Sequence, residues 1–425
     1  MPERAIAFDL TRLITRMRHA SPTGIDRVDL AYARHVFAGS GPRFGLVTSA
    51  FGPRVIDRAQ ARAVVEAVGA GWVEDMRAED DPIYRRLAEG TRERPTPAGE
   101  RRDSFRRRRV QAATVLRSLR ARGIAALPPG AVYLHSAHLR LDLPGRFDWL
   151  YDRRDIRPIF FVHDLIPISH PEYGPPGEAA RHARRMETIA RHAAAVIVNS
   201  TDVGARFSSH LAARGFSPKP ITVAPLGVEP AFSTRAGEPA HFSRPTFLAC
   251  GTIESRKNHL LLLQLWRELA ARHGADTPHL VIVGRRGWEV ENVIDLLDRC
   301  TATAPYVTEV TGLSTPGLAR LMRGATALLM PSFIEGYGLP VVEAAASGLP
   351  VVASDIAVHR EIGRAFAHLL DPLDGRGWHA AIEALSVPGS PLRRALAGRL
   401  DGYRAPTWPA HLEKLDAVIA ALDVP

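Results

Sequence analysis

Short apolar runs, rich in β-branched residues, alternate with longer stretches of helical periodicity along almost the whole chain. Runs of about four to eight such residues are typical of buried strands. Strands that alternate with helices in this way predict parallel sheets covered by helices on both faces. We expect strands at residues 5–10, 44–48, 131–135, 158–163, 195–199 and 221–225, and then at 246–250, 280–284, 307–311, 327–331, 350–354 and 367–371.

The expected strands fall into two sets, which predicts an α/β protein with two doubly wound domains. A chain of 425 residues is also too long for one core. The joint is expected in GVEPAFSTRAGEPAHFS, residues 227–243, which is rich in Gly, Pro and Ser. The expected units are an N-terminal domain at 1–228, with an irregular basic insertion at about 53–130, a C-terminal domain at 229–405, and a C-terminal helix at 406–425 that packs back on the N-terminal domain.

The net charge of +10 is concentrated in one segment. Arg85–Arg122 contains thirteen arginines and four acidic residues, a local balance of +9, so the rest of the chain is close to neutral. Residues 84–122 contain two aromatic residues, Tyr84 and Phe105, which are too few for stacking on nucleic acid bases. We therefore expect no specific nucleic acid partner, and predict a peripheral contact with an anionic membrane through Arg85–Arg122.

The remaining composition indicates a soluble, cytoplasmic protein, with this peripheral contact at the inner face of the cell membrane. The N-terminal residues lack an apolar segment of signal-peptide length, and no apolar run approaches the ~18 residues of a membrane span. Cys250 and Cys300 lie far apart in the sequence, which favours neither a disulfide framework nor a metal site.

Two glutamates bracket a glycine-rich turn in FIEGYGLPVVEAA, residues 333–345. This stretch follows an expected strand, and Pro340 suits the first position of a helix, with Glu343 in its first turn. Helix N-termini at the carboxyl ends of parallel strands are common anion sites. An acid at the positive end of a helix would explain Glu343 alone, but not Glu335 with the two glycines. We therefore interpret both glutamates as hydrogen-bond acceptors beside an anion site.

A second cluster, GTIESRKNH at residues 251–259, follows the first expected strand of the second domain. The chain has only three lysines, Lys219, Lys257 and Lys414, against 52 arginines. A lysine beside Arg256 in a strand-to-helix loop is therefore unusual here, and the pair favours a diphosphate site.

Weaker candidates lie in the first domain. Thr23 and Asp26 have the spacing of a capping box before an expected helix, and Gly24 would let backbone amides approach a phosphate. A plain helix start explains this motif equally well. His163 follows an expected strand at its carboxyl end, which favours a role in a site, whereas His135 is more readily explained as structural.

Together these motifs resemble the retaining glycosyltransferases of family 4, in the bacterial branch that builds polysaccharide and lipopolysaccharide. The E-x7-E signature of the family appears as EGYGLPVVE, residues 335–343, followed by ASGLPVVASDIAVHREI. TIESRKNH and VHDLIPISHPEY also match. The resemblance is dense over 158–362, extends to 5–35 and is absent over 53–130. It implies the GT-B fold, in which two Rossmann-like parallel-sheet domains face a central cleft.

The resemblance also implies roles for particular residues. Glu335 would hold the hydroxyls of the donor sugar, Glu343 the nucleotide ribose and Lys257 the diphosphate, with His163 near the transferred sugar and Gly24 in the phosphate loop of the N-terminal domain. The catalytic residues implied are His163, Lys257 and Glu335. The substrate-binding residues implied are Thr23, Gly24, Ile25, Arg256, Lys257, Glu335, Gly336, Tyr337, Gly338, Leu339 and Glu343.

The activity implied is transfer of a hexose, with retention, from a nucleotide-diphosphate sugar to a glycan or lipid-linked acceptor. Polysaccharide-building relatives favour mannose from GDP-mannose. The nucleotide sugar is a co-substrate, so no cofactor is expected, and the absence of an Asp-x-Asp motif disfavours a metal-dependent reaction. The chain departs from the family at Thr252, where many relatives carry an arginine that Arg256 is expected to replace, and it has one glycine instead of a pair in the N-terminal loop.

Other functions remain open at this point. A glycoside hydrolase also uses two carboxylates, but a helix N-terminus keeps carboxylates ionised and makes them poor general acids. A GT-B epimerase of nucleotide sugars would share the donor site and would need no acceptor. A basic nucleic-acid-binding module is the non-enzymatic alternative.

Overall fold

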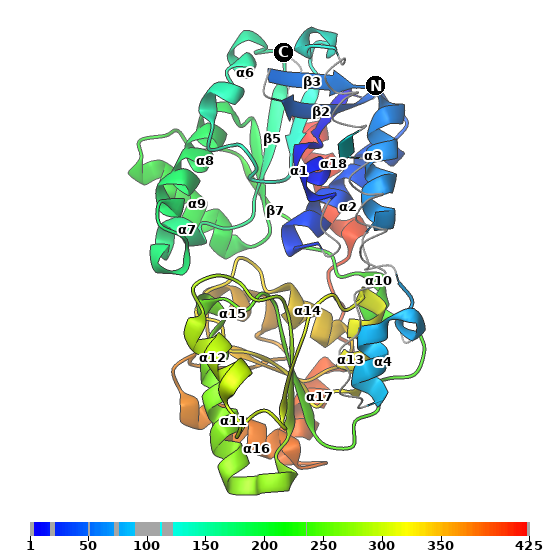
Figure 1. The fold of residues 1–425 in the computed structure, drawn as a ribbon. Helices are drawn as coiled ribbons and strands as arrows, with labels where there is room; N and C mark the ends of the chain where they lie inside the picture. Colours follow the sequence, from blue (N-terminus) through cyan, green and yellow to red (C-terminus); the bar gives the residue numbers. More distant parts are fainter. Residues whose placement is uncertain are drawn as a thin grey trace. The chain divides into compact units, whose positions relative to one another are not determined.

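The computed structural model describes residues 4–17, 22–49, 52–71, 76–89, 111–112, 122–234 and 236–422. The chain divides into two compact units (Figure 1). The first unit comprises Met1–Trp72, Thr96–Leu226 and Trp408–Pro425, and the second comprises Val73–Pro95 and Gly227–Thr407. Each unit is an α/β layered structure with its own sheet, and each is described by itself.

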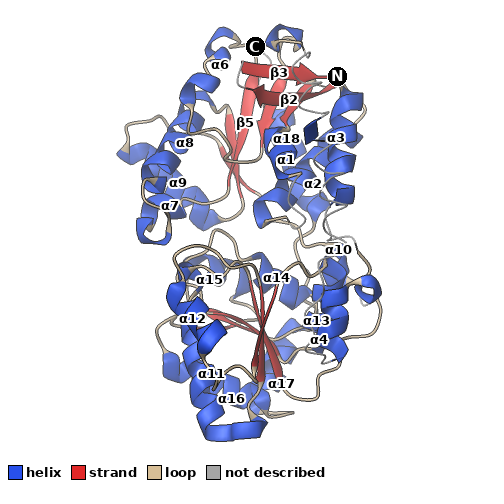
Figure 2. Ribbon diagram, viewed as in Figure 1, coloured by secondary structure: helices blue, strands red, loops and turns tan. Residues whose placement is uncertain are grey.

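The first unit is built on a seven-stranded sheet in the order β3-β2-β1-β4-β5-β6-β7, with helices on both faces (Figure 2). Neighbouring strands are parallel except β2 and β3. The strands are β1 (Ile6–Asp9), β2 (Arg43–Ser49), β3 (Gly52–Ile56), β4 (Val132–His135), β5 (Arg157–Val162), β6 (Ala195–Val198) and β7 (Ile221–Val223). The helices are α1 (Thr11–Arg16), α2 (Gly24–Ala38), α3 (Arg58–Gly71), α6 (Trp149–Asp152), α7 (Ile166–Ser169), α8 (Glu178–His192), α9 (Thr201–Ala213) and α18 (Trp408–Ala421).

The second unit is built on a six-stranded, fully parallel sheet in the order β10-β9-β8-β11-β12-β13. Its strands are β8 (Thr246–Cys250), β9 (His279–Val283), β10 (Val307–Val310), β11 (Ala327–Met330), β12 (Val351–Ser354) and β13 (His368–Leu370). Its helices are α4 (Pro82–Glu89), α10 (Pro230–Ser233), α11 (His259–His273), α12 (Glu291–Arg299), α13 (Thr315–Gly324), α14 (Leu339–Ala346), α15 (Ala357–Gly363), α16 (Gly375–Ser386) and α17 (Pro391–Leu400).

The central strands are apolar along their whole length because helices cover both faces of each sheet. Every residue of β4, β6, β8 and β11 is buried. The core of the first unit includes Phe160 and Val196, and that of the second includes Phe247 and Trp266. Each expected strand is present, with ends that differ by at most two residues.

Strand β3 is a strand that the sequence pattern missed, and helices α3 and α4 also lie in the stretch expected to be irregular. It lies within the stretch expected to be irregular and pairs antiparallel with β2, with Pro53 opposite Thr48. Proline lacks the amide hydrogen that a central strand needs, but β3 is an edge strand, where proline is tolerated. Gly52 and Pro53 are unusual in a central strand, so the sequence pattern did not predict this strand at the edge of the sheet.

The expected first domain, 1–228, is wrong in one respect, because Val73–Pro95 belongs to the second unit. In this segment the buried Asp81 carboxylate accepts a hydrogen bond from Ser314 N at the start of α13, 2.7 Å away. Arg320 of α13 also pairs with Glu79 and lies over the Tyr84 ring. Of Arg85–Arg122, residues 85–89, 111–112 and 122 are described, so most of the predicted membrane contact lies outside the described residues.

The C-terminal helix α18 belongs to the first unit. His411 bonds the Tyr32 hydroxyl through Nε2, 2.8 Å away, and the Pro225 carbonyl through Nδ1, 2.9 Å away. Because His411 is buried between α2 and the end of β7, the helix is fixed by polar contacts as well as by apolar packing.

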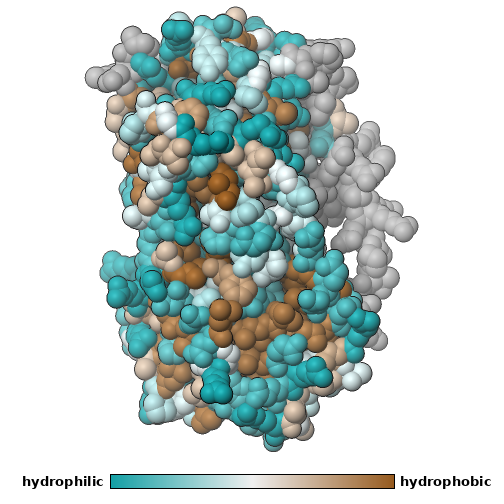
Figure 3. Space-filling view, turned by 90° about the vertical axis from the view of Figure 1, so that its left-hand side faces the viewer, coloured by the Kyte–Doolittle hydropathy of each residue, from teal (hydrophilic) through white to brown (hydrophobic). Residues whose placement is uncertain are grey.

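Some apolar side chains reach the surface. Figure 3 shows one face, on which apolar side chains gather most over the second unit. Large hydrophobic residues of that unit that are exposed are Leu260, Leu373 and Val387. Among the described residues, no helix combines the length and the hydropathy that a membrane span requires.

Candidate functional site

The switch point of the second sheet lies between β8 and β11, where the strand order reverses. In open α/β sheets, ligands bind beyond the carboxyl ends of the strands at such a point. The loop after β8 contains Arg256 and Lys257, and the loop after β11 contains Glu335. A backbone hydrogen bond from Phe333 N to Arg256 O, 2.8 Å, ties these two loops together.

Glu335 is held by three donors at this switch point. Its Oε1 accepts hydrogen bonds from Lys257 Nζ at 2.5 Å and from Ser332 Oγ at 2.8 Å. Its Oε2 accepts a hydrogen bond from Arg256 Nη1 at 2.9 Å. Glu335 and Lys257 are both buried, so these are charge-assisted contacts in a region of low dielectric.

The two cations decide the charge state of Glu335. Burial by itself would raise the pKa of Glu335, but the charges of Lys257 and Arg256 lower it well below its ordinary value. The carboxylate therefore stays ionised at neutral pH and acts as a hydrogen-bond acceptor. An ionised carboxylate with three donors is a poor general acid, which argues against the hydrolase alternative.

Local backbone geometry brings Lys257 to this position. Gly251, directly after β8, has φ +131°, and a Cβ there would lie 3.2 Å from Lys257 Cε and Nζ. Asn258 adopts φ 55°, a left-handed conformation that asparagine tolerates, and its Nδ2 donates to Pro372 O at 2.9 Å. The short turn Ser255–Lys257 between them is a single 3-10 turn that precedes α11.

Gly338 is the N-cap of the neighbouring helix, α14. It has φ 93°, and a Cβ at this position would lie 3.3 Å from His359 Nε2. The helix starts at Leu339, and Pro340 is its second residue. Glu343 therefore lies in the second turn, whereas the sequence pattern predicted the first turn. The positive end of the helix therefore does not account for the buried Glu343.

Two histidines near Glu335 were not predicted from the sequence. Burial lowers the pKa of His259 to about 4, and the nearby Lys257 charge adds to this effect. Burial also lowers the pKa of His359, although Glu335 raises it, and the ring accordingly donates from Nδ1 to Ser354 O at 3.0 Å. Both rings are neutral at pH 7, so Lys257 and Arg256 supply the positive charge around Glu335.

The first unit has its own switch point, between β1 and β4. Helix α2 comes after β1 and α1 in the chain and starts at the exposed Gly24, directly after Thr23. The predicted capping box is confirmed: Thr23 N donates to Asp26 Oδ2 at 2.7 Å, and Asp26 N donates to Thr23 Oγ1 at 3.4 Å. Ile25 is half-buried in the first turn of the helix.

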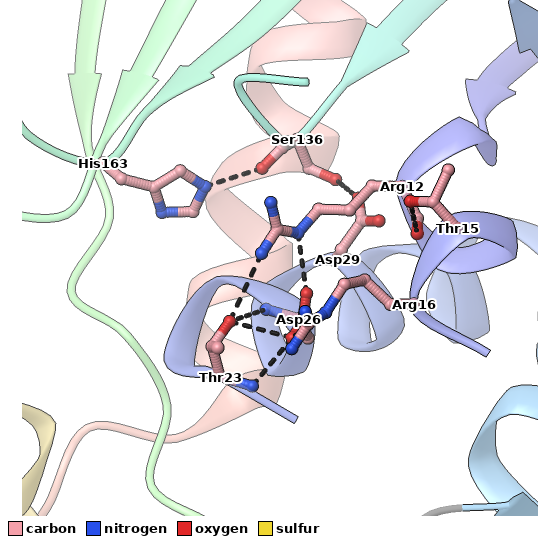
Figure 4. A network of polar contacts seen from close by, with 8 residues as sticks. All are labelled: Arg12, Thr15, Arg16, Thr23, Asp26, Asp29, Ser136 and His163. Carbon is pink, nitrogen blue, oxygen red and sulfur yellow. Dashed lines mark hydrogen bonds and ion pairs between the residues drawn. The ribbon is translucent and has the colours of Figure 1, made fainter. Parts of the chain in front are cut away.

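Arg12 and Arg16 of α1 extend this motif, and neither was predicted. Their Nε atoms donate to Asp26 Oδ1 at 2.7 Å and Oδ2 at 3.0 Å, and Arg12 Nη2 reaches Thr23 Oγ1 at 3.3 Å (Figure 4). Burial would raise the pKa of Asp26, but the charge of Arg12 lowers it below its ordinary value. The spacing of two arginines four residues apart, directly after a strand, is the sequence signal for this cluster.

His163 lies directly after β5, and its ring Nε2 donates to Ser136 O at 2.7 Å (Figure 4). Its backbone amide donates to His138 Nε2 at 3.3 Å. Burial lowers the pKa of His163 to about 4, so the ring is neutral at pH 7. His135, in contrast, is buried inside the sheet and bonds the Tyr133 hydroxyl through Nδ1 at 2.9 Å, which supports a structural role.

The predicted residues thus form two groups. Arg256 and Lys257 are in direct contact with Glu335. Gly336 and Tyr337 lie in the loop that follows Glu335, Gly338 is the N-cap of α14, and Leu339 and Glu343 lie on that helix. Thr23, Gly24, Ile25 and His163 belong to the first unit. Within the described ranges, no three His, Cys, Asp or Glu side chains are grouped to hold a metal ion.

Comparisons with known proteins show what the chain is similar to. Residues 244–386 match the family model described as glycosyl transferases group 1. The serotype-specific mannosyltransferase WbdA of Escherichia coli is 31% identical over 222 residues, 49% of this chain and 27% of WbdA. The D-inositol 3-phosphate glycosyltransferase of Pseudarthrobacter chlorophenolicus is 30% identical over 246 residues, 55% of this chain and 57% of that protein. The matched part of this chain therefore spans about a quarter of the length of WbdA and little more than half of the length of the second relative.

The fold agrees with a solved structure. Anabaena HepE in complex with UDP-glucose aligns over 99% of this chain and 100% of its own, with a TM-score of 0.63 and 12% sequence identity. The two sheets of this chain, with parallel strands apart from β3, and the group 1 match over residues 244–386 agree with this similarity of fold. The chain therefore has the GT-B fold, and within it residues 244–386 match the glycosyl transferases group 1.

Proposed function

We propose that this protein is a retaining, metal-independent hexosyltransferase that moves mannose from GDP-mannose to a glycan or lipid-linked acceptor in bacterial surface polysaccharide assembly. The observation that carries the proposal is the buried Glu335 carboxylate, which contacts both Lys257 and Arg256 at the switch point of the second sheet. A fold of this class binds its ligand at that edge.

Lys257 and Arg256 are proposed to bind the donor diphosphate. Their charges are matched by Glu335 and by Glu254, whose Oε2 lies 3.0 Å from Arg256 Nε. A diphosphate at this place would receive charge-assisted hydrogen bonds from both side chains and from the amides at the start of α14. The same groups would stabilise the charge that develops on the leaving nucleotide.

The two glutamates are proposed to bind hydroxyl groups. Glu335 is ionised, so it accepts and cannot donate, which suits the hydroxyls of a sugar. Glu343 lies buried in the second turn of α14 and is assigned to the nucleotide ribose. Both Glu335 oxygens already accept hydrogen bonds, which makes a covalent glycosyl-enzyme at this residue unfavourable. We therefore favour front-face attack, in which a donor phosphate oxygen takes the proton of the acceptor.

The choice of donor follows the named relatives. WbdA is a mannosyltransferase, and so are the O-antigen chain mannosyltransferase B of Escherichia coli and RfbU of Salmonella typhimurium. Anabaena HepE was solved with UDP-glucose, which makes this compound the appropriate competitor.

The test is release of free nucleotide from GDP-mannose, UDP-glucose and UDP-mannose, each with and without a mannose-terminated, lipid-linked acceptor. We expect release from GDP-mannose that depends on the acceptor, and an α-linked product. A product of inverted configuration would contradict the retaining mechanism. Nucleotide release from UDP-glucose but not from GDP-mannose would contradict GDP-mannose as the donor. Conversion of the nucleotide sugar without acceptor would favour the epimerase or the hydrolase.

A further inference from the structure

We propose that Asp29 is a positioning residue, which holds the His163 ring in one orientation and one tautomer through Ser136. The inference rests on the proposed function, because it concerns the histidine assigned to the neighbourhood of the transferred sugar. Three elements carry it: Asp29 from α2, Ser136 from the loop after β4, and His163 from the end of β5. Figure 4 shows Ser136 between the other two side chains.

The contacts form a continuous chain. Ser136 Oγ donates to Asp29 Oδ1 at 2.5 Å, and the carbonyl of the same serine accepts a hydrogen bond from His163 Nε2 at 2.7 Å. All three residues are buried, and Asp29 has no exposed surface. The side chain of Ser136 is therefore tied to α2 while its backbone holds the imidazole, so displacement of the serine would also displace the ring.

The contact with Ser136 fixes the tautomer of His163. A carbonyl oxygen has no hydrogen to give, so the hydrogen of this bond must be on Nε2 of the histidine. Since the neutral ring carries one N–H group, its Nδ1 is then an acceptor. His163 in this state can accept a hydrogen bond from a sugar hydroxyl, and it cannot donate one from Nδ1.

Packing alone does not explain a carboxylate at position 29. The neighbouring buried residues of α2 include Val28, Leu30 and Ala33. Asp29 Oδ2 is also buried and has no hydrogen-bond partner within the described structure. An unpartnered buried oxygen is destabilising, and an apolar residue would avoid that cost. The carboxylate is therefore expected to serve the bond to Ser136.

The charges around Asp29 make the contact dependent on pH. Arg12 of α1, Asp9 of β1 and His135 of β4 face the carboxylate. Burial raises the pKa of Asp29 to about 7, with the bond from Ser136 acting in the opposite direction. A hydroxyl bond to an ionised carboxylate is stronger than one to a neutral carboxyl group. The support of Ser136 should therefore weaken as the pH falls below about 7.

The experiment compares Ser136→Ala and Asp29→Asn with the native chain. Thr188→Val is the control, because it removes another buried hydroxyl of the same unit, which donates to Leu141 O at 2.8 Å. Nitrogen-15 spectra of histidine-labelled protein, with the signal assigned by His163→Gln, report the tautomer. Steady-state kinetics from pH 5.5 to 8.5 report kcat and KM.

We expect native His163 to carry its hydrogen on Nε2, and Ser136→Ala to shift its signals and lower kcat by about tenfold. In the native chain, kcat should fall as the pH decreases below about 7. Asp29→Asn should abolish this pH dependence of kcat, because asparagine does not ionise. Thr188→Val should change neither the histidine signals nor kcat. A hydrogen on Nδ1, unchanged signals and kcat in Ser136→Ala, or an acid limb that survives in Asp29→Asn would overturn the proposal. Absence of sugar transfer by the native chain would contradict the proposed function, while the spectra would still decide the positioning role.

Discussion

Asp81 and Ser314 are 233 positions apart in the sequence, yet the Asp81 carboxylate accepts a hydrogen bond from the Ser314 amide 2.7 Å away. The same carboxylate caps α4, because Oδ1 accepts from Ile83 N at 2.8 Å and from Tyr84 N at 3.2 Å. One side chain thus fixes the starts of α4 and α13. Asp81 belongs to Val73–Pro95, a segment of the second unit that lies in the sequence between two stretches of the first, and its contact with Ser314 joins that segment to the rest of the second unit.

Asp81→Ala should therefore reduce the stability of the second unit by about 2 kcal/mol, since three amides lose a charged acceptor. Hydrogen exchange should accelerate at the start of α13 as well as in α4. Asp57→Ala is the matched control, because Asp57 is exposed and caps α3 through Gln60 N at 2.8 Å. Equal effects of the two variants, confined to the neighbouring helix, would show that Asp81 is only a local cap.

Acid should destabilise the fold through its buried histidines. Burial lowers the pKa of His163 and His259 to about 4 from an ordinary value of 6.5. The unfolded chain binds these protons first, so their contribution is complete above pH 6.5 and is lost as the pH falls toward 4. Each histidine contributes up to about 3 kcal/mol to this pH-dependent loss in the free energy of unfolding. Urea unfolding at pH 7.5 and pH 5 should show this loss, and His259→Leu should reduce the difference; an unchanged pH dependence would contradict it.

The metal-independent mechanism predicts that turnover survives excess EDTA. Lys257, Arg256 and the start of α14 would supply the positive field that a divalent ion supplies in other glycosyltransferases. Nucleotide release should be the same, within error, after dialysis against EDTA and after addition of Mg²⁺ or Mn²⁺. Activity that is lost with EDTA and restored by either ion would contradict this mechanism.

The arginine-rich segment predicts adsorption to anionic membranes. Each cation near such a surface contributes about 1 kcal/mol, and salt screens the attraction. Sedimentation with vesicles of phosphatidylcholine alone, or with phosphatidylglycerol added, should show binding to the anionic vesicles only. Equal partition onto both would rule out an electrostatic contact through Arg85–Arg122.

The two glutamates should separate binding from turnover. Glu343→Gln should weaken the binding of free GDP by about 1.5–3 kcal/mol, because a ribose contact exists in substrate and product alike. Glu335→Gln should leave GDP affinity nearly unchanged and lower kcat, because its assigned contact is to the sugar. Calorimetry and steady-state kinetics give both values. If both variants weaken GDP binding equally, the assignment of one glutamate to each group is wrong.

Local patterns in the sequence were sufficient to predict the strands and the capping box of Thr23 and Asp26. The rarity of lysine also drew attention to Lys257, which proves to be buried against Glu335. Edge strand β3 was missed because Pro53 argues against a strand unless its edge position is known.

Long-range contacts were beyond any local pattern. Nothing near Asp29 in the sequence indicates Ser136, and nothing near Asp81 indicates Ser314, because both pairs form only when distant segments pack. The start of α14 was misplaced by one residue, since Gly338 can cap a helix that begins at Leu339 before the proline. Glu343 therefore lies in the second turn of the helix instead of the first.

The central claim is that Lys257 and Arg256, which both contact Glu335, bind the diphosphate of the donor. Calorimetry with GDP and GMP on Lys257→Met tests it most directly. Lys414→Met is the control, because Lys414 is exposed and donates to Val223 O at 2.8 Å. We predict that Lys257→Met weakens GDP at least tenfold and GMP far less, while Lys414→Met changes neither. Native GDP affinity in a folded Lys257→Met protein would contradict the claim.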